Sequence, residues 1–214
     1  MMKNNLVHIC TMLSISLLMC TYAIAEPATK ADIALKANTA PQAMTESFKA
    51  RGQSKLDRLL QDNAMAACSE YANKLIPAKI AARITAQNLQ AIPFPKDGQY
   101  LGDWKAGERI AQSGVGKQFS DNPDNPSGGN CYACHQLSPQ ELSYGTIGAS
   151  LSQYGEQHGY SNEIAKYAYG KIFNLQAYLA CATMSRFGHN HILTDTQIKD
   201  LVALLMDPAS PVNK

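Results

Sequence analysis

The hydrophobic positions of this chain recur at intervals of three and four residues, which is the spacing of amphipathic helices. In the first half of the chain, segments 43–62, 64–75 and 76–92 each carry such a stripe. A loop with Pro93, Pro95 and Asp97-Gly98 then interrupts the pattern. The pattern predicts three helices that pack either on the domain that follows or on a partner.

The second half of the chain has sharper helix boundaries, because residues that cap helices stand at the starts of its apolar stripes. No alternation typical of a strand stands out, so the chain is predicted to be all-α. A helix over 104–112 is expected to be capped by Asp103, and its Gly107 would allow a close helix crossing. A second helix is expected over 162–180, capped by Ser161. The last begins with the capping box Thr194–Gln197 and ends at Pro208.

A cysteine motif lies between these helices, after the polar loop 113–130. Cys131-Tyr132-Ala133-Cys134-His135 reads as Cys-x-x-Cys-His, the attachment motif of a c-type haem. The two thiols would form thioethers with the haem vinyl groups, and the histidine would offer a ring nitrogen to the iron. A thioredoxin-like redox pair would need a βαβ context, and a zinc site would need a second Cys/His pair. Neither is visible, so one covalently attached haem c is predicted.

The N-terminus has the pattern of a secretory signal peptide. Lys3 precedes an apolar run, and Ala23-Ile24-Ala25 is a small-x-small cleavage site, which predicts a signal peptide over residues 1–25. Cys20 raises the alternative of a lipoprotein, although Met19 before it fits a lipobox poorly. Residues 26–98 then form a leader and helical extension, and residues 99–214 form the haem domain. A periplasmic location is expected, because c-type haem is attached outside the cytoplasm.

Six cysteines are present, of which Cys10 and Cys20 lie in the signal segment. With Cys131 and Cys134 assigned to the haem, Cys68 and Cys181 remain as an even pair in an oxidising compartment. A disulfide between them is the favoured hypothesis. Two buried free thiols are the plain alternative, and a thiolate iron ligand is a third.

A low-spin electron carrier needs a second axial ligand on its iron. Met184 is the favoured candidate, because it lies in an irregular loop just before the last helix and such a loop can cross the distal face of a haem. His189 and His191 in the same loop are the alternatives, whereas Met206 belongs to the packing face of the last helix. With His135 and Met184 as ligands, both axial positions would be filled, which favours electron transfer over chemistry at this iron.

Composition excludes some classes of function. The 214-residue chain has a formal net charge of +2 and 45% hydrophobic residues, as expected of a globular protein. A charge so close to zero gives no electrostatic support for nucleic-acid binding. The apolar run near the N-terminus is short for a membrane span, and no later run is longer.

Several segments around the motif resemble SoxX, the family of monohaem c-type cytochrome subunits of the SoxAX complex of sulfur oxidation. The resemblance covers about residue 43 to the C-terminus. It rests on Gly102-Asp103-Trp104-Lys105, Gly128 to His135, Tyr144-Gly145-Thr146-Ile147-Gly148, Met184 to Gly188, Ile192-Leu193-Thr194 and Asp207 to Asn213.

The resemblance implies a class I cytochrome c-like haem domain with an N-terminal helical extension. Cys131 and Cys134 would hold the haem, with His135 and Met184 as iron ligands, and the carbonyl of Ala149 would accept a hydrogen bond from His135. A SoxA-like subunit would carry the catalytic haem of this L-cysteine S-thiosulfotransferase, which couples thiosulfate to a cysteine of the SoxY carrier. This chain would pass the electrons to a soluble cytochrome, and its extension would help to hold SoxA.

Two other functions remain open at this point. A free-standing periplasmic electron shuttle would have the same haem site without a catalytic partner. A haem-based sensor or peroxidase would need an open or labile sixth position on the iron, which stable ligation by Met184 would close.

Overall fold

The computed structural model describes residues 42–214, so the predicted signal peptide and nearly all of the leader lie outside the described residues. Residues 44–214 form one compact unit. Its regular elements are α-helices and short 3-10 helices, with a single isolated β-bridge between Arg51 and Ser54 among the described residues. The prediction of an all-α chain is confirmed for this part of the protein.

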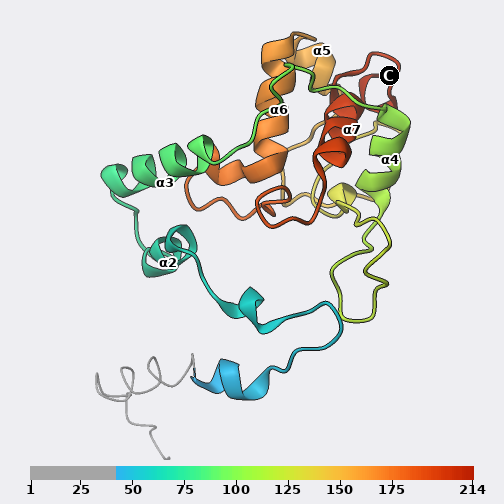
Figure 1. Ribbon diagram of the computed structural model, residues 1–214. Helices are drawn as coiled ribbons and strands as arrows, with labels where there is room; N and C mark the ends of the chain where they lie inside the picture. The colour runs from blue at the N-terminus through green and yellow to red at the C-terminus, as the bar shows by residue number, and fades with distance from the viewer. Residues whose placement is uncertain (1–41) are drawn as a thin grey trace, which may run out of the picture. The chain divides into compact units, whose positions relative to one another are not determined.

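Helices α4 (Trp104–Gln112) and α7 (Asp195–Met206) lie side by side (Figure 1). They cross closely because Gly107 has no side chain: a Cβ there would lie 2.7 Å from the backbone carbon of Asp200 and closer still to its oxygen. The close crossing expected at Gly107 is therefore confirmed. Most of α7 is buried, including Ile198, Val202 and Leu204, each with no exposed surface.

Helix caps fix these two helices where the sequence predicts them. The Asp103 carboxylate accepts from the Lys105 N–H at 2.9 Å and begins α4. Thr194 and Gln197 form the predicted capping box at the start of α7. Each cap satisfies backbone N–H groups that the first turn of a helix leaves without an internal partner.

Helix α6 (Asn162–Asn174) packs beside α7, with Tyr169 fully buried and its hydroxyl donating to Asp195 at 2.5 Å. Ser161 caps it as predicted, but the helix ends six residues earlier than expected and continues as the 3-10 helix η3 (Leu175–Ala177). Asn174 explains the early end, because its side chain accepts from the Gln176 N–H at 3.1 Å and so competes with the helical backbone. The short helix α5 (Tyr154–His158) was not among the predicted helices.

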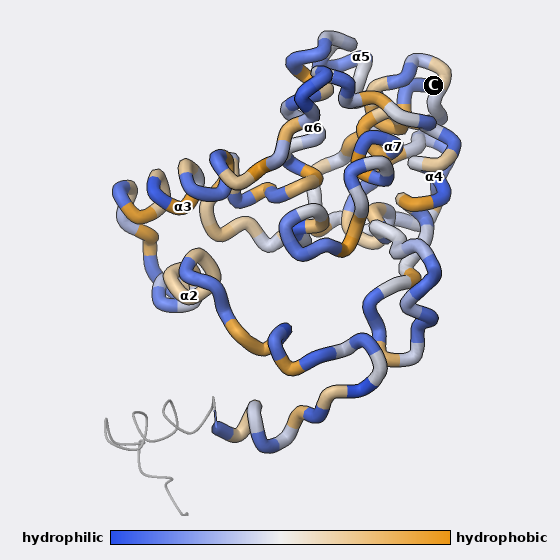
Figure 2. Tube along the Cα trace, in the orientation of Figure 1, coloured by the Kyte–Doolittle hydropathy of each residue, from blue (hydrophilic) through white to orange (hydrophobic). Residues whose placement is uncertain are grey.

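The extension consists of η1 (Leu56–Leu59), α2 (Asn63–Glu70) and α3 (Ala78–Gln90). Apolar and polar residues alternate along α3, as Figure 2 shows, and α3 packs against η3 and α6. A buried bond joins them: the Asn174 amide donates to the Asn88 side-chain oxygen at 2.7 Å. The extension thus packs on the domain that follows it, which was one of the two expectations.

The prediction of one helix over 43–62 is wrong, because only residues 42–47 are α-helical there and the rest holds just the short 3-10 helix η1. The chain turns at Gly52, which has φ +50° and lies so close to the Phe119 backbone that a Cβ would not fit. Arg51 stacks on the Phe119 ring, 4.2 Å from its centroid. Contacts with the distant loop 113–130 therefore replace the helix that the local pattern suggests. The second predicted helix, 64–75, is shortened to α2.

Candidate functional site

The Cys-x-x-Cys-His motif forms a single tight turn. Residues Cys131–Ala133 are the 3-10 helix η2, and Asn130 before them has a left-handed backbone with φ +47°. The N–H groups of Cys134 and His135 both donate to the Cys131 carbonyl, at 3.1 and 2.9 Å. Both cysteines are free thiols and half-buried. The turn thus presents two thiols and an imidazole within five residues.

The imidazole of His135 is held in a defined orientation. Its Nδ1 lies 2.7 Å from the Ala149 carbonyl oxygen, the contact that the family resemblance implied. A carbonyl only accepts, so Nδ1 carries the proton and the lone pair of Nε2 is left for a metal. Gly148 lies directly against the ring: a Cβ there would be 2.6 Å from Nε2 and nearer to two other ring atoms.

One apolar cavity brings the predicted site residues together. His135, Met184 and Cys131 all line it, although Met184 is far from the motif in sequence. The cavity is small, with a volume of about 40 Å³, and it is partly open to solvent. The other walls are all hydrophobic side chains: Leu137, Leu151, Ile172, Phe187, Leu201, Leu204 and Leu205. A histidine nitrogen and a methionine sulfur in such surroundings are a donor set for haem iron.

The alternative ligands lie elsewhere. The Nε2 of His189 is 3.6 Å from an Asp62 carboxylate oxygen, and burial, together with nearby Arg186, lowers the pKa of His189 below its usual value. His191 is exposed, with a left-handed backbone at φ +52°. Neither histidine lines the cavity, whereas Met184 does. Met206 is buried in the packing of α7, as expected.

The electrostatics of the motif are unlike those of a thiol-redox site. Burial raises the pKa of the Cys131 thiol to about 12, and the nearby Glu108 carboxylate adds to this effect. A reactive cysteine of a Cys-x-x-Cys redox pair instead has a lowered pKa, so that the thiolate can attack. The Tyr132 hydroxyl donates to Glu108 at 3.2 Å, and burial also raises the pKa of that carboxyl group.

A disulfide joins Cys68 of α2 to Cys181, 113 residues later, with a Cα–Cα distance of 5.3 Å. This is the pair that remained after the haem motif and the signal segment were assigned. Disulfides persist in oxidising compartments and are rare in the cytosol. The bond is therefore consistent with an exported protein. The described residues contain no helix of the length and hydrophobicity needed to cross a membrane. Among them no cluster of three or more His, Cys, Asp and Glu side chains is arranged for a metal ion.

Sequence reasoning missed two features of this site. It named Gly148 only as the end of the segment Tyr144 to Gly148 that carries the resemblance, and did not place it against the His135 ring. It also missed Asp62, which accepts from Arg186 at 2.7 Å and so contacts the Met184 loop from the extension. No local pattern marks that pair, because its partners are 124 residues apart.

Comparison with known proteins gives one informative match. No protein-family model matches the chain. An uncharacterized lipoprotein of Aquifex aeolicus (strain VF5) is 36% identical over 157 residues, which cover 72% of this chain and 73% of the relative. Identity at this level over most of both proteins shows that they belong to one family. The chain belongs to the same family as this lipoprotein.

Proposed function

We propose that this chain is a monohaem c-type cytochrome that transfers electrons as the SoxX-like subunit of a SoxAX-type complex. The observation that carries the proposal is the shared cavity: the motif residues Cys131 and His135 face the same apolar space as Met184. The free Nε2 of His135, set by the bond from Nδ1 to Ala149, supports the same interpretation.

The residues present fit a c-type haem. Cys131 and Cys134 would hold it through thioether bonds, with the His135 Nε2 and the Met184 sulfur as axial ligands. The apolar walls would exclude water from the iron, and a thioether ligand favours the ferrous state. When bound, the haem supplies a one-electron redox couple. With both axial positions filled, substrate chemistry would take place elsewhere.

A class I cytochrome c-like fold is part of this proposal. The motif lies between α4 on its N-terminal side and α7 on its C-terminal side, and these two helices cross closely at Gly107. Leu201, Leu204 and Leu205 of α7 form one wall of the cavity. The last helix would therefore cover one side of the haem.

The place in a SoxAX-type complex rests on the resemblance. A SoxA-like subunit with its own haem would join thiosulfate to a cysteine thiolate of a SoxY-type carrier, forming a sulfur–sulfur bond with the release of two electrons. This chain would accept those electrons one at a time and pass them to a soluble cytochrome. Its own residues would bind no thiosulfate.

An extracytoplasmic location fits both the disulfide and the relative, which is named a lipoprotein. In the proposal, the signal peptide is cleaved before Glu26 and the mature protein is periplasmic. The lipoprotein name gives weight to the alternative, in which Cys20 becomes the lipidated first residue. Both positions lie outside the described residues.

The first experiment produces the chain with a c-type haem maturation system and records a pyridine haemochrome spectrum. We expect one haem per chain with the spectrum of two thioether bonds, and no covalent haem after Cys131→Ala with Cys134→Ala. We also expect a near-infrared methionine–iron band, lost in Met184→Ala and retained in Met44→Ala, a matched change in the extension. A protein without covalent haem contradicts the proposal, and an unchanged band in Met184→Ala contradicts the ligand.

The second experiment tests the partner. Purification from the native host should give a complex with a second c-type cytochrome. A monomer that never co-purifies with one would identify a free-standing electron shuttle instead. Ready binding of carbon monoxide to the reduced protein would point to a sensor or peroxidase, because that requires an open or labile sixth position.

A further inference from the structure

Helix α2 contacts the Met184 loop on both sides of the methionine. The disulfide from Cys68 reaches Cys181, three residues before Met184. The Asp62 carboxylate, at the N-cap of the same helix, binds Arg186 at 2.7 Å, two residues after Met184. One eight-residue helix with its cap is therefore bonded to both ends of a six-residue span of the loop, residues 181–186.

The Asp62–Arg186 pair is well formed for a contact near the surface. The Arg186 side chain is only 11% exposed, and that of Asp62 is 39% exposed. Burial raises the pKa of Asp62, but the Met65 N–H and the Arg186 guanidinium outweigh it, so that the pKa lies below its ordinary value. The carboxylate is thus charged at neutral pH, as a partner for arginine must be.

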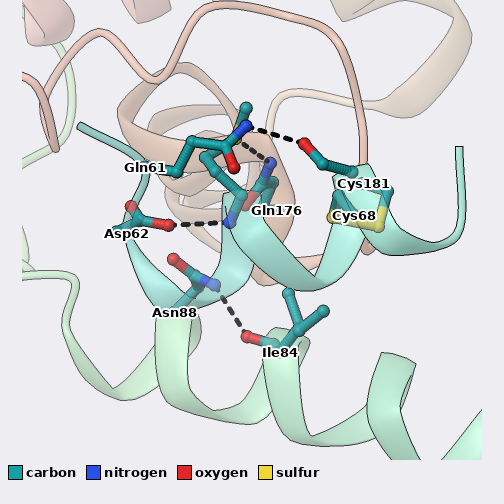
Figure 3. Close-up of a disulfide and its surroundings, with 9 residues drawn as sticks. Gln61, Asp62, Cys68, Ile84, Asn88, Gln176 and Cys181 are labelled. Carbon is teal, nitrogen blue, oxygen red and sulfur yellow. Dashed lines mark hydrogen bonds between the residues drawn. A yellow bond between two sulfur atoms is a disulfide. The ribbon is translucent and has the colours of Figure 1, made fainter. Parts of the chain in front are cut away.

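Noncovalent packing gives α2 little further support. None of its residues is fully buried. Gln176 lies beside it (Figure 3), with its Nε2 donating to the Met65 sulfur at 3.5 Å. Thioether sulfur is a weak acceptor, and the Gln176 Oε1 is buried without a hydrogen-bond partner in the described part of the chain. The disulfide and the ion pair are therefore the main links between α2 and the loop.

The loop needs such links to keep one conformation. Residues 182–186 form no helix or strand. Cys181, where the loop begins, has a left-handed backbone with φ +62°, which is uncommon for a residue with a side chain. Conformations of this kind persist only when surrounding contacts hold them.

We propose that α2 is a clamp that positions Met184 at the haem iron, with Asp62, Cys68 and Cys181 as positioning residues. The clamp rests on the proposed function, because it acts on the methionine ligand. Without it, the loop samples conformations in which the Met184 sulfur leaves the iron. The extension then has a role within this chain, separate from any role in holding a partner subunit.

The test compares holo-proteins that carry Cys68→Ser with Cys181→Ser, or Asp62→Asn alone. Asp57→Asn is the matched control, because Asp57 is an exposed carboxylate of the same extension with no bond from its side chain in the described residues. The readouts are haem content, the near-infrared methionine–iron band, and the affinity of the reduced protein for carbon monoxide. Met184→Ala gives the band intensity and the carbon monoxide affinity expected when the methionine ligand is lost completely.

We expect full haem content in every variant. The double serine variant should lose at least half of the band, and its affinity for carbon monoxide should rise about tenfold if the methionine-free population rises tenfold. Asp62→Asn should change both readouts in the same direction by less, and Asp57→Asn should match the wild type. A double variant that fails to fold leaves Asp62→Asn as the deciding case.

The clamp is wrong if both clamp variants keep the full band and the wild-type affinity for carbon monoxide. That result would leave the proposed function intact, because the wild type would still show haem and the methionine band. A wild type without haem would contradict the proposed function, and a wild type with haem but no methionine band would contradict Met184 as the ligand. A change in thermal stability alone, with an unchanged band, would assign the disulfide a purely structural role.

Discussion

Gly148→Ala should displace the imidazole that we propose as an iron ligand, because the glycine lies against the His135 ring. An added Cβ would lie 2.6 Å from Nε2 and closer still to Cε1 and Nδ1, and ordinary contact begins at 3.4 Å, so the ring must retreat by at least 0.8 Å. A retreat of that size away from the Ala149 oxygen would stretch the 2.7 Å bond from Nδ1 to about 3.5 Å or more, the limit for a hydrogen bond.

The expected loss of stability combines two terms. Overpacking costs about 1–3 kcal/mol, and a lost hydrogen bond costs about 0.5–1.5 kcal/mol. We therefore expect the free energy of unfolding to fall by about 1.5–4.5 kcal/mol, together with a weaker iron–histidine bond. Guanidinium unfolding of the holo-protein, followed by circular dichroism and by the haem absorption, measures the first quantity. Resonance Raman spectroscopy of the iron–histidine vibration in the Met184→Ala background measures the second.

Gly114→Ala is the matched control for this prediction. Its Cβ would lie 3.4 Å from the Asn130 side chain, an ordinary contact, and its φ is not in the left-handed region. Because alanine restricts the unfolded chain more than glycine does, Gly114→Ala should leave the free energy of unfolding unchanged or raise it by about 0.4–1 kcal/mol. If Gly148→Ala is no less stable than Gly114→Ala and keeps the iron–histidine vibration, the argument from the ring contact is refuted.

Three further predictions concern the rest of the chain. Burial raises the pKa of Glu108 above its usual value of about 4.3, so the native state binds this proton more tightly than the unfolded state. The free energy of unfolding should therefore fall as pH rises through and above that value, and Glu108→Gln should remove this slope in urea unfolding measured across the acid-to-neutral range. Cys68→Ser with Cys181→Ser opens a loop of 113 residues and should lower the free energy of unfolding by up to about 4.8 kcal/mol in the chain-entropy account, measured without reductant. Mass spectrometry of the mature protein should find Glu26 as the first residue, and a diacylglyceryl group on Cys20 would instead identify a lipoprotein.

Helices in the second half of the chain could be predicted closely because their boundaries are local. Asp103 and Thr194 each cap a helix within three residues of their own position. The apolar stripe of α7 and its capping box then give the same start. Where the capping residues and the apolar periodicity indicate the same helix boundary, tertiary contacts rarely change it.

The extension could not be predicted as well, because its breaks depend on distant contacts. The chain turns at Gly52 where it meets Phe119, and α2 is tied to residues more than a hundred positions later. A helical stripe over 43–62 contains no information on these contacts. Periodicity shows which face of a segment is apolar, but the partner of that face decides whether the segment stays helical.

The candidate site was predictable to the extent that its chemistry is written in short motifs. The motif Cys131 to His135 predicts haem attachment by itself, and Met184 was favoured as the second iron ligand by its place before the last helix. The Gly148 contact and the bond to Ala149 need the loop to fold back onto the motif. Only the folded chain puts them within reach of the imidazole.

The extension and the haem domain are better understood as one functional unit than as two. Residues 44–214 form one compact unit, and the boundary expected near residue 98 would separate the Met184 loop from α2, to which it is bonded. A haem domain that started at residue 99 would keep His135, its carbonyl partner and the walls from α7. It would lose both links at the ends of the Met184 loop. If the clamp positions the ligand, the shortest chain with a stable methionine-bound haem must begin before Asp62.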